Sequence, residues 1–220
     1  MREFVDGGFM SVADITETRV FNASQIVPQR LTWEEYLRFG EENTLAEWID
    51  GRVIVLFSGS TKHQQIVGFL DRVIGFYIET HNLGQIFTAP YAMKLNKLRR
   101  GREPDLLFVS CEREHLITKT FLDGAADLVV EVVSPESVER DSVQKFAEYE
   151  AAGIREYWLI DYTNQTAIFY QLDDKGQYHA AEITGGVFRS AVLPGFFIRE
   201  PWLWQERLQT FEALRELGIL

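Results

Sequence analysis

The chain has 220 residues, of which 46% are hydrophobic and 25% charged, the composition of an ordinary soluble globular domain, and its net charge is −11. That acidic balance argues against a broad basic surface for nucleic acid, because phosphate contacts rely on Lys and Arg. No run approaches the roughly 20 apolar residues of a membrane-spanning helix, the first residues form no secretory signal, and Cys111 is the single cysteine, so we expect a cytoplasmic protein without disulfides or membrane contacts.

The N-terminal residues 1–27 are polar and weakly patterned, so we predict an extension there and a single domain over residues 28–220. The domain opens on Thr32-x-x-Glu35, a capping-box pattern that marks a helix start. An Asp-Gly turn between two strand-like runs, typical of a hairpin, and then apolar residues at helical spacing follow. In chain order these patterns predict a short helix, a hairpin and the longest helix, over residues 32–39, 47–56 and 61–81.

The second half of the chain alternates strand and helix patterns. Residues 126–133 are nearly all apolar, as in a strand covered on both faces, and the next predicted helix ends at Gly153, a residue suited to a left-handed cap. The other predicted strands are 85–95, 104–110, 155–161 and 166–172, with hairpin-like sequence near 177–190, and the predicted helices are 138–152 and 202–217. This order predicts one mixed α/β domain with a mostly antiparallel sheet.

Glu131 is the most informative candidate residue, because its neighbours in the strand over residues 127–133 demand burial. An unpaired carboxylate at such a position is costly and would take up a proton instead. Glu131 therefore needs a lysine or arginine, a hydrogen-bond network or a metal ion as its partner. Its local sequence fits a structural ion pair between sheet and helix as well as it fits a functional role.

Asp105 follows Pro104 and opens another apolar strand. Alone, such a residue is more often a turn residue or a solvated strand end. If the strands of Asp105 and Glu131 pair with both carboxylates on one face, however, a divalent cation is the usual remedy for the repulsion between them. Carboxylate, water and phosphate oxygens suit magnesium or manganese.

Lys145 lies on the helix predicted after the strand of Glu131. Asp141, Lys145 and Tyr149 recur at four-residue spacing, and Glu148 lies on an adjacent row, so these side chains share one side of the helix. One interpretation is a surface pair between Asp141 and Lys145, worth a few tenths of a kcal/mol. The interpretation that we favour points Lys145 back at the carboxylates, where its charge can orient an attacking water.

The order Pro104-Asp105, Glu131 and a lysine on the following helix resembles the PD-(D/E)XK nuclease superfamily. A closer resemblance is to the Uma-two family of the restriction-endonuclease group, and it covers about residues 28–200. The motifs that carry it are Glu47, the Ile49-Asp50-Gly51 turn, His63, residues 131–137, Arg140-Asp141, Lys145, Tyr149 and residues 153–161. The resemblance implies a restriction-endonuclease-like core, with a mixed β-sheet flanked by helices, additional C-terminal strands and a terminal helix.

The resemblance also implies a metal-dependent endonuclease that hydrolyses DNA phosphodiester bonds with Mg²⁺ or Mn²⁺. Two residues after Glu131 the superfamily pattern has lysine, whereas this chain has Val133, so the resemblance assigns that role to Lys145 on the helix. The implied catalytic residues are Asp105, Glu131, Lys145 and Glu47. As a hypothesis, Asp105, Glu131 and the Val132 carbonyl hold the metal.

The candidate substrate-binding residues are His63, Gln64, Lys97, Arg99, Arg100 and Tyr149. Three of them belong to the basic stretch over residues 94–102, which carries five Lys or Arg in nine residues and is more simply explained as an exposed hairpin loop than as a DNA clamp. Plain alternatives also exist upstream, since Glu47 can end a strand in solvent and His63 can simply occupy a first helical turn. We therefore expect weak or transient binding of DNA.

Other functions fit the same residues. A nuclease-like fold can retain its acidic cluster as a binding module without cleavage, and the acidic surface and the missing strand lysine suit that alternative. The cluster can also serve a metal-dependent hydrolase of another phosphate ester. Trp158, Trp202 and Trp204 fit a homodimer interface and ordinary core packing equally well.

Overall fold

The larger part of the domain is built on a central sheet of six strands. The computed structural model describes residues 24–26, 29–40, 45–56, 59–133 and 140–220. In spatial order the central sheet comprises β12 (Tyr178–Ala180), β11 (Thr166–Leu172), β10 (Glu156–Asp161), β9 (Leu128–Val133), β7 (Leu106–Ser110) and β4 (Gly84–Thr88). Only the β9–β10 pair of this sheet is parallel, and all six residues of β9 are buried. This confirms the strand expected to be covered on both faces.

A second sheet, which we call the N-terminal sheet, is built from strands within residues 24–122. Its strands, in spatial order, are β1 (Ser24–Ile26), β3 (Arg52–Leu56), β2 (Ala46–Ile49), β6 (Arg100–Arg102), β5 (Ala92–Leu95) and β8 (Phe121–Leu122). The remaining pair is β13 (Val187–Arg189) with β14 (Phe197–Arg199). The α-helices are α1 (Trp33–Gly40), α2 (Thr61–His81), α3 (Phe146–Ala152) and α4 (Thr210–Glu216).

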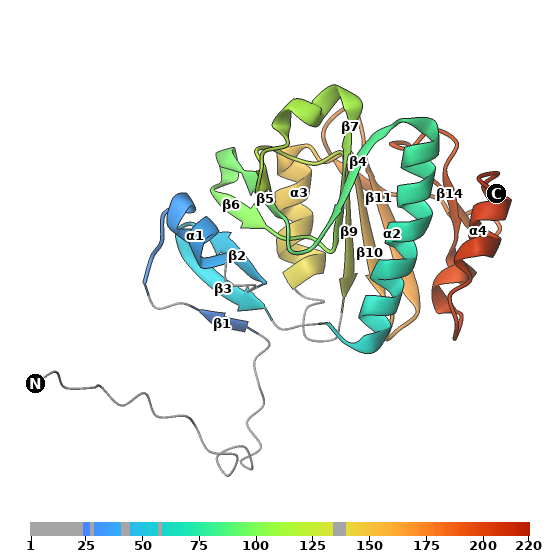
Figure 1. The fold of residues 1–220 in the computed structure, drawn as a ribbon, viewed down its shortest axis with the longest axis horizontal. Coiled ribbons are helices and arrows are strands. Elements are labelled where there is room, and N and C mark those ends of the chain that lie inside the picture. The colour runs from blue at the N-terminus through green and yellow to red at the C-terminus, as the bar shows by residue number, and fades with distance from the viewer. Residues whose placement is uncertain (1–23, 27–28, 41–44, 57–58, 134–139) are drawn as a thin grey trace, which may run out of the picture.

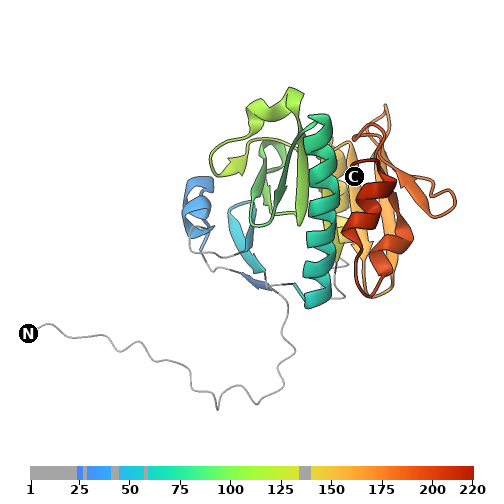
Figure 2. The same ribbon diagram turned by 45° about the vertical axis from the view of Figure 1, so that its right-hand side comes forward.

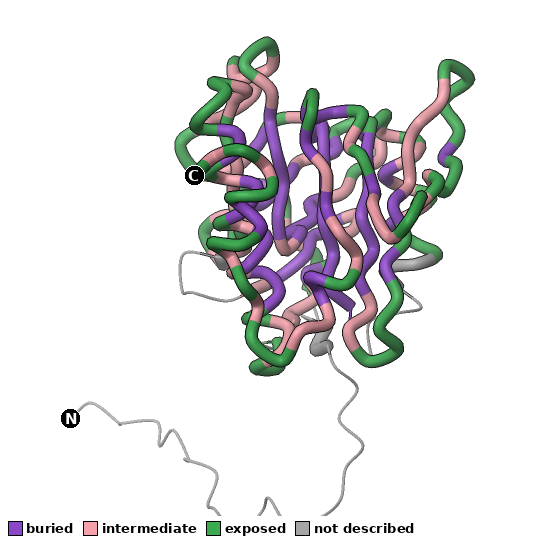
Figure 3. The backbone as a smooth tube through the Cα atoms, turned by 90° about the vertical axis from the view of Figure 1, so that its right-hand side faces the viewer, coloured by how far each residue is buried: buried purple, intermediate pink, exposed green. Residues whose placement is uncertain are grey.

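The helices α2 and α3 cover opposite faces of the central sheet (Figure 1). On one face, Val130 packs into a core with the buried side of α2, and α4 lies beside α2 in both ribbon views (Figure 2). On the other face, Val129 shares a core with Tyr149 of α3 and with Met93 of β5. Figure 3 shows the buried stretches running through the strands, while exposed backbone gathers at the turns. The arrangement confirms a mixed β-sheet flanked by helices.

Local sequence signals account for the first elements of the domain. Thr32 and Glu35 form the reciprocal capping box at 2.7 and 3.2 Å, so α1 begins where the pattern predicts. Asp50 and Gly51 both adopt positive φ, at 49° and 87°, as a tight hairpin turn requires. The helix α2 has the predicted bounds, and the Ser60 side chain caps its start. Within the described parts of the chain, no helix combines the length and apolar character needed to span a bilayer.

Several predicted elements are divided differently in the structure. The run over residues 85–95 contains two strands, β4 and β5, of different sheets, separated at the cis Ala89–Pro90 bond. The expected loop after it contains a 3₁₀ turn and β6, because residues 100–102 pair with both β5 and β2. The pairing itself is mostly antiparallel, as predicted: among the described strands, only β9 with β10 and β5 with β8 are parallel pairs.

The predicted C-terminal hairpin and helix also differ from the structure. The strands β12 and β13 do not pair with each other, because β12 extends the central sheet beside β11 and β13 pairs with β14. The predicted helix 202–217 is a 3₁₀ turn (Glu200–Trp204) followed, after a non-helical stretch, by the shorter α4. In that stretch the Gln205 carbonyl accepts a hydrogen bond from Lys62 of α2 at 2.9 Å, which holds the chain against α2 rather than in a helix.

Candidate active site

Glu131 lies near the end of β9 on the face covered by α3, and its carboxylate has the partners that its burial demands. Its Oε1 accepts a hydrogen bond from the Tyr149 hydroxyl at 2.7 Å and from the Lys145 ammonium at 2.8 Å. The Glu131 side chain is only 5% exposed, so these contacts form away from bulk water. A lysine and a tyrosine one helical turn apart thus converge on one carboxylate oxygen.

Lys145 is buried and shared between the two sheets. It is the last residue of a π-helical turn (Arg140–Lys145) that leads into α3, and its side chain is 2% exposed. Its Nζ lies 3.0 Å from Oε1 of Glu47, which is fully buried on β2. Lys145 therefore contacts one carboxylate of the N-terminal sheet and one of the central sheet. The alternative pair with Asp141 concerns a side chain outside the described residues.

Arg102 of β6 extends this network and was not identified as a candidate from the sequence. Its Nη1 donates to Oε2 of Glu47 at 2.5 Å, while its Nε and Nη2 donate to the two carboxylate oxygens of Glu148 at 2.7 and 2.9 Å. Burial alone would lower the pKa of Arg102, but the two carboxylates outweigh burial and hold the pKa above its ordinary value. The Glu47 carboxylate is thereby held from one side by Arg102 and from the other by Lys145.

Asp105 lies beside the strand of Glu131, immediately before β7. Leu106 pairs with Val130, so the same antiparallel register continues from Asp105 towards Glu131. Oδ2 of Asp105 accepts a hydrogen bond from the Val132 N–H at 2.7 Å, and Oδ1 lies 3.1 Å from Nε2 of His63. His63 belongs to the first turn of α2, so that turn is anchored to the strand that carries Asp105.

The hydroxyl and carboxyl groups around the network have shifted pKa values. Burial, reinforced by the carboxylates of Glu131 and Glu47, raises the pKa of Tyr149 well above its ordinary value, so its hydroxyl remains a donor at neutral pH. Burial also raises the pKa of Glu103 to about 7, although the Tyr36 hydroxyl and the Ala46 N–H donate hydrogen bonds to it. Glu103 and Tyr36 lie close to the site but were not expected there, whereas Tyr149 was predicted to belong to it.

Four predicted substrate-binding residues lie apart from Glu131 and Lys145. Gln64 is exposed on α2, and Lys97 is exposed in the turn between β5 and β6. Arg99 lies 3.2 Å from Asp50, while Arg100 contacts Asp50 at 2.6 Å and Glu148 at 2.8 Å. Two of the basic side chains are therefore engaged with carboxylates of this chain.

The residues that the sequence interpretation missed are Arg102, Glu148 as its partner, and Glu103. Arg102 was counted within the basic stretch, where its charge suggested a solvent-exposed loop. The available signal was the need of the buried Glu47 and the partly buried Glu148 for a cation, but that need becomes visible only when β6 is known to pair with β2.

Asp105 and Glu131 offer oxygen donors of the kind that magnesium takes, but a metal site between them stays a prediction. Among the described residues, no group of three or more His, Cys, Asp or Glu side chains is arranged to hold a metal ion. Mg²⁺ commonly binds through one or two carboxylates and completes its shell with water and substrate phosphate. Asp105 and Glu131, brought to adjacent strands, match that donor set, with the Val132 carbonyl as the further oxygen that we predict.

A known family matches most of the chain. The family Uma2, described as "Putative restriction endonuclease", matches residues 33–200. The chain belongs to this family. No curated protein matches the chain. The Uma2 chain is also similar to a crystal structure described as a "putative nuclease belonging to DUF820" from Anabaena variabilis ATCC 29413, with a TM-score of 0.65 and 18% identity over 79% of this chain and 97% of that one. At this identity the likeness shows a shared fold.

Proposed function

We propose that this Uma2 protein is a divalent-metal-dependent endonuclease that hydrolyses DNA phosphodiester bonds. The observation that carries the proposal is the buried Lys145 ammonium 2.8 Å from Glu131, on a strand next to the one that Asp105 precedes. An acidic pair beside a lysine is the residue set that the family motif predicts. The family description as a restriction endonuclease supports the same activity.

Asp105, Glu131 and the Val132 carbonyl would hold Mg²⁺ or Mn²⁺. When bound, such an ion lowers the pKa of a coordinated water and offsets charge on the scissile phosphate. Lys145 orients the attacking water through its ammonium, and Glu47 holds that ammonium from the side opposite Glu131. Tyr149 fixes the Glu131 carboxylate by donating its hydroxyl proton.

The proposed substrate-binding residues include one that lies beside Asp105, but they supply little positive charge for DNA. His63 contacts Asp105, which supports the proposal that it would meet substrate beside that carboxylate. Arg99 forms an ion pair with Asp50, and Arg100 forms one with Glu148. These ion pairs leave less positive charge for DNA, which fits the expected weak or transient binding. Action in the cytoplasm is a further prediction, which rests on the single cysteine. Trp158 and Trp202 are buried in the core of a single chain and Trp204 packs against it, so the tryptophans give no support to the predicted homodimer.

A binding module without cleavage is the second candidate function. It is favoured by one observation: Lys145 is 2% exposed and shared between two carboxylates, as in a purely structural ion network. A hydrolase of another phosphate ester would use the same residues, since the cluster itself does not select DNA.

One experiment separates these candidates. Purified protein is incubated with supercoiled plasmid and with single-stranded DNA, in Mg²⁺, in Mn²⁺ or in chelator, beside the Asp105→Asn and Glu131→Gln variants. The proposal predicts that DNA is cleaved only when Mg²⁺ or Mn²⁺ is present, and that both variants lose this cleavage. Binding without cleavage supports the binding module, and turnover of a simple phosphate ester without DNA cleavage supports the other hydrolase. Cleavage that survives chelation or either substitution excludes the proposed site.

A further inference from the structure

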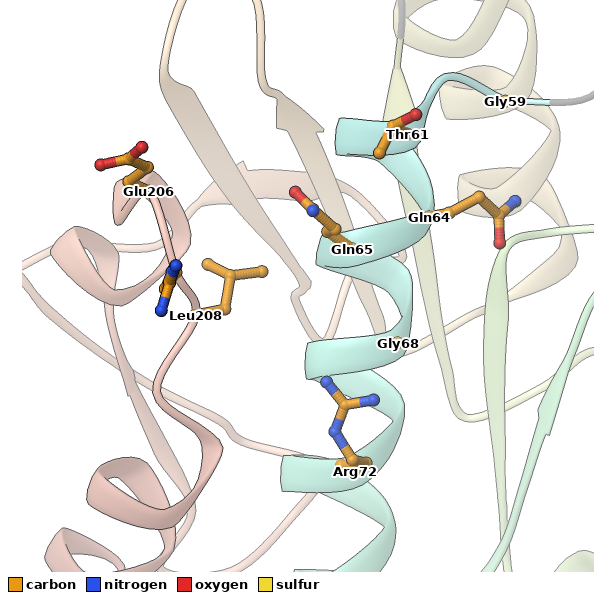
Figure 4. A pocket seen from close by; sticks show the side chains of 9 residues that line it. Gly59, Thr61, Gln64, Gln65, Gly68, Arg72, Glu206 and Leu208 are labelled. Atoms are coloured by element: carbon orange, nitrogen blue, oxygen red, sulfur yellow. The ribbon is translucent and has the colours of Figure 1, made fainter.

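An open cleft of about 650 Å³ lies between the N-terminal half of α2 and the segment that precedes α4. In Figure 4, Thr61, Gln65 and Arg72 project from α2, and Glu206 and Leu208 lie across from them. Polar and apolar groups both line the cleft. None of these five residues belongs to the network around Glu131.

The cleft adjoins the candidate active site through Gly59. Gly59 lines the cleft, and a Cβ added to it would overlap the imidazole of His63. His63 in turn lies 3.1 Å from Asp105. The His63 side chain therefore separates the Gly59 end of the cleft from Asp105, the proposed metal-binding carboxylate.

The charge of the cleft suits a phosphate backbone. Its charged lining residues are Arg72, Arg207 and Glu206, and both arginines are exposed. Within the described part of the chain, neither arginine takes part in an ion pair, in contrast to Arg99 and Arg100. Both guanidinium groups thus keep their charge for a ligand.

The geometry of α2 favours an extended ligand. Arg72 donates to the Thr210 hydroxyl at 3.3 Å, and its Nη1 lies over Gly68, where a Cβ would be 3.3 Å away. Gly68 thus leaves space for the guanidinium to lie along the helix. From Thr61 to Arg72 the helix rises about 16 Å at 1.5 Å per residue, the length of several nucleotides of a DNA strand.

We propose that this cleft binds the sugar–phosphate backbone of a DNA strand and leads it to the active site, with Arg72 and Arg207 as the phosphate contacts. The proposal rests on the proposed nuclease function and names the surface that would hold its substrate. It also bears on the objection from the net charge of −11, since the two cleft arginines, which form no ion pair with the residues that the structure describes, act locally where the strand would lie.

The test measures DNA binding in chelator, where the proposed cleavage is off. Fluorescence anisotropy follows a labelled DNA strand, and separately its duplex, over a salt series with the full-length protein and the double variant Arg72→Ala/Arg207→Ala. The slope of log affinity against log salt should fall by about 0.9 per lost contact on duplex or about 0.7 on a single strand, and affinity at low salt should fall about tenfold or more. The form of DNA, single strand or duplex, whose slope and affinity change more in the double variant is the form that the cleft binds.

The matched control is Arg38→Ala/Arg52→Ala, which removes the same charge from exposed positions away from the cleft. It should keep the slope of the unmodified protein. An unchanged slope in the cleft variant, or an equal change in the control, would overturn the cleft as the binding surface even if the protein cleaves DNA. A slope change confined to the cleft variant, in a protein that cleaves nothing with any metal, would uphold the cleft and remove the nuclease function.

Discussion

The ammonium of Lys145 lies 2.8 Å from the carboxylate of Glu131, although the strand position where the nuclease pattern has lysine is the buried Val133. Lys145, on the helical segment that follows β9, thus supplies the cation that the strand itself does not provide for Glu131. The same ammonium contacts Glu47, so the arrangement also joins the two sheets. Under the proposed function, stability and activity should therefore depend on the same side chain.

Lys145→Met removes the cation shared by two buried carboxylates. The free energy of unfolding should fall by about 3–5 kcal/mol, because removing one partner leaves buried negative charge without compensation. Urea denaturation in chelator measures the change. The control Lys175→Met, at an exposed position, should stay within about 0.5 kcal/mol of the parent. A loss for Lys145→Met no larger than the control would mean that the two carboxylates do not depend on this ammonium.

Arg102 and Glu148 should be energetically coupled, since the guanidinium and carboxylate meet through two parallel hydrogen bonds. A double-mutant cycle of Arg102→Met and Glu148→Gln should give a coupling energy of about 1–3 kcal/mol. Arg102→Lys should not restore stability, because one ammonium cannot satisfy both Glu148 and Glu47 in that geometry. Additive changes in the free energy of unfolding, or full stability in Arg102→Lys, would argue against the paired hydrogen bonds between Arg102 and Glu148.

Gly59→Ala tests the contact between Gly59 and His63. The added methyl group overlaps the His63 imidazole, so the ring must shift relative to Asp105. DNA cleavage should fall about tenfold or more, since misplacement by about 1 Å near reacting groups is costly. Gly75→Ala is the control, because its Cβ would meet Ile86 at an ordinary 3.7 Å and alanine favours the helix by about 0.5–1 kcal/mol. Equal activity in the two variants would show that the position of His63 is unimportant.

Asp127 should make stability depend on pH in the acid range. Burial alone would raise the pKa of Asp127, but the Ser110 N–H at 2.8 Å and the arginines Arg113 and Arg155 lower it below its ordinary value. A lowered folded-state pKa gives stability that is present above the unfolded value of about 3.9 and is lost as the pH falls through the folded value. Asp127→Asn should therefore destabilise the protein at neutral pH, and the difference should shrink below about pH 4. Denaturation curves at both pH values test this, and a pH-independent difference would contradict it.

Much of the fold follows from local sequence patterns. The capping box, the Asp50-Gly51 turn and the helical spacing over Thr61–His81 each depend on neighbours in sequence, and each element appears at the predicted place. The burial of Glu131 also follows from its apolar neighbours, and so does its need for a partner. The identity of that partner came from the family resemblance rather than from the spacing.

The remaining part of the site depends on contacts between distant segments. Arg102 lies in a three-residue strand, too short to show an alternating pattern, and its charge suggested a loop. Its burial becomes necessary only when β6 enters the N-terminal sheet beside β2 and brings it to Glu47. The predicted C-terminal helix begins at residue 202, before the observed start of α4, because Trp202 and Leu203 resemble the apolar face of a helix. In the structure both residues are buried in a 3₁₀ turn.

The central claim is tested most directly by single-turnover cleavage of one defined DNA substrate in Mg²⁺. The rates of three proteins are compared: the parent, Glu131→Gln, and Glu212→Gln, a control at an exposed position of α4. The account predicts that Glu131→Gln cleaves at least about 100-fold more slowly, about 3 kcal/mol in the barrier, while the control keeps the parent rate. Equal rates for the parent and Glu131→Gln would contradict it, because the activity would then arise outside the Asp105, Glu131 and Lys145 cluster.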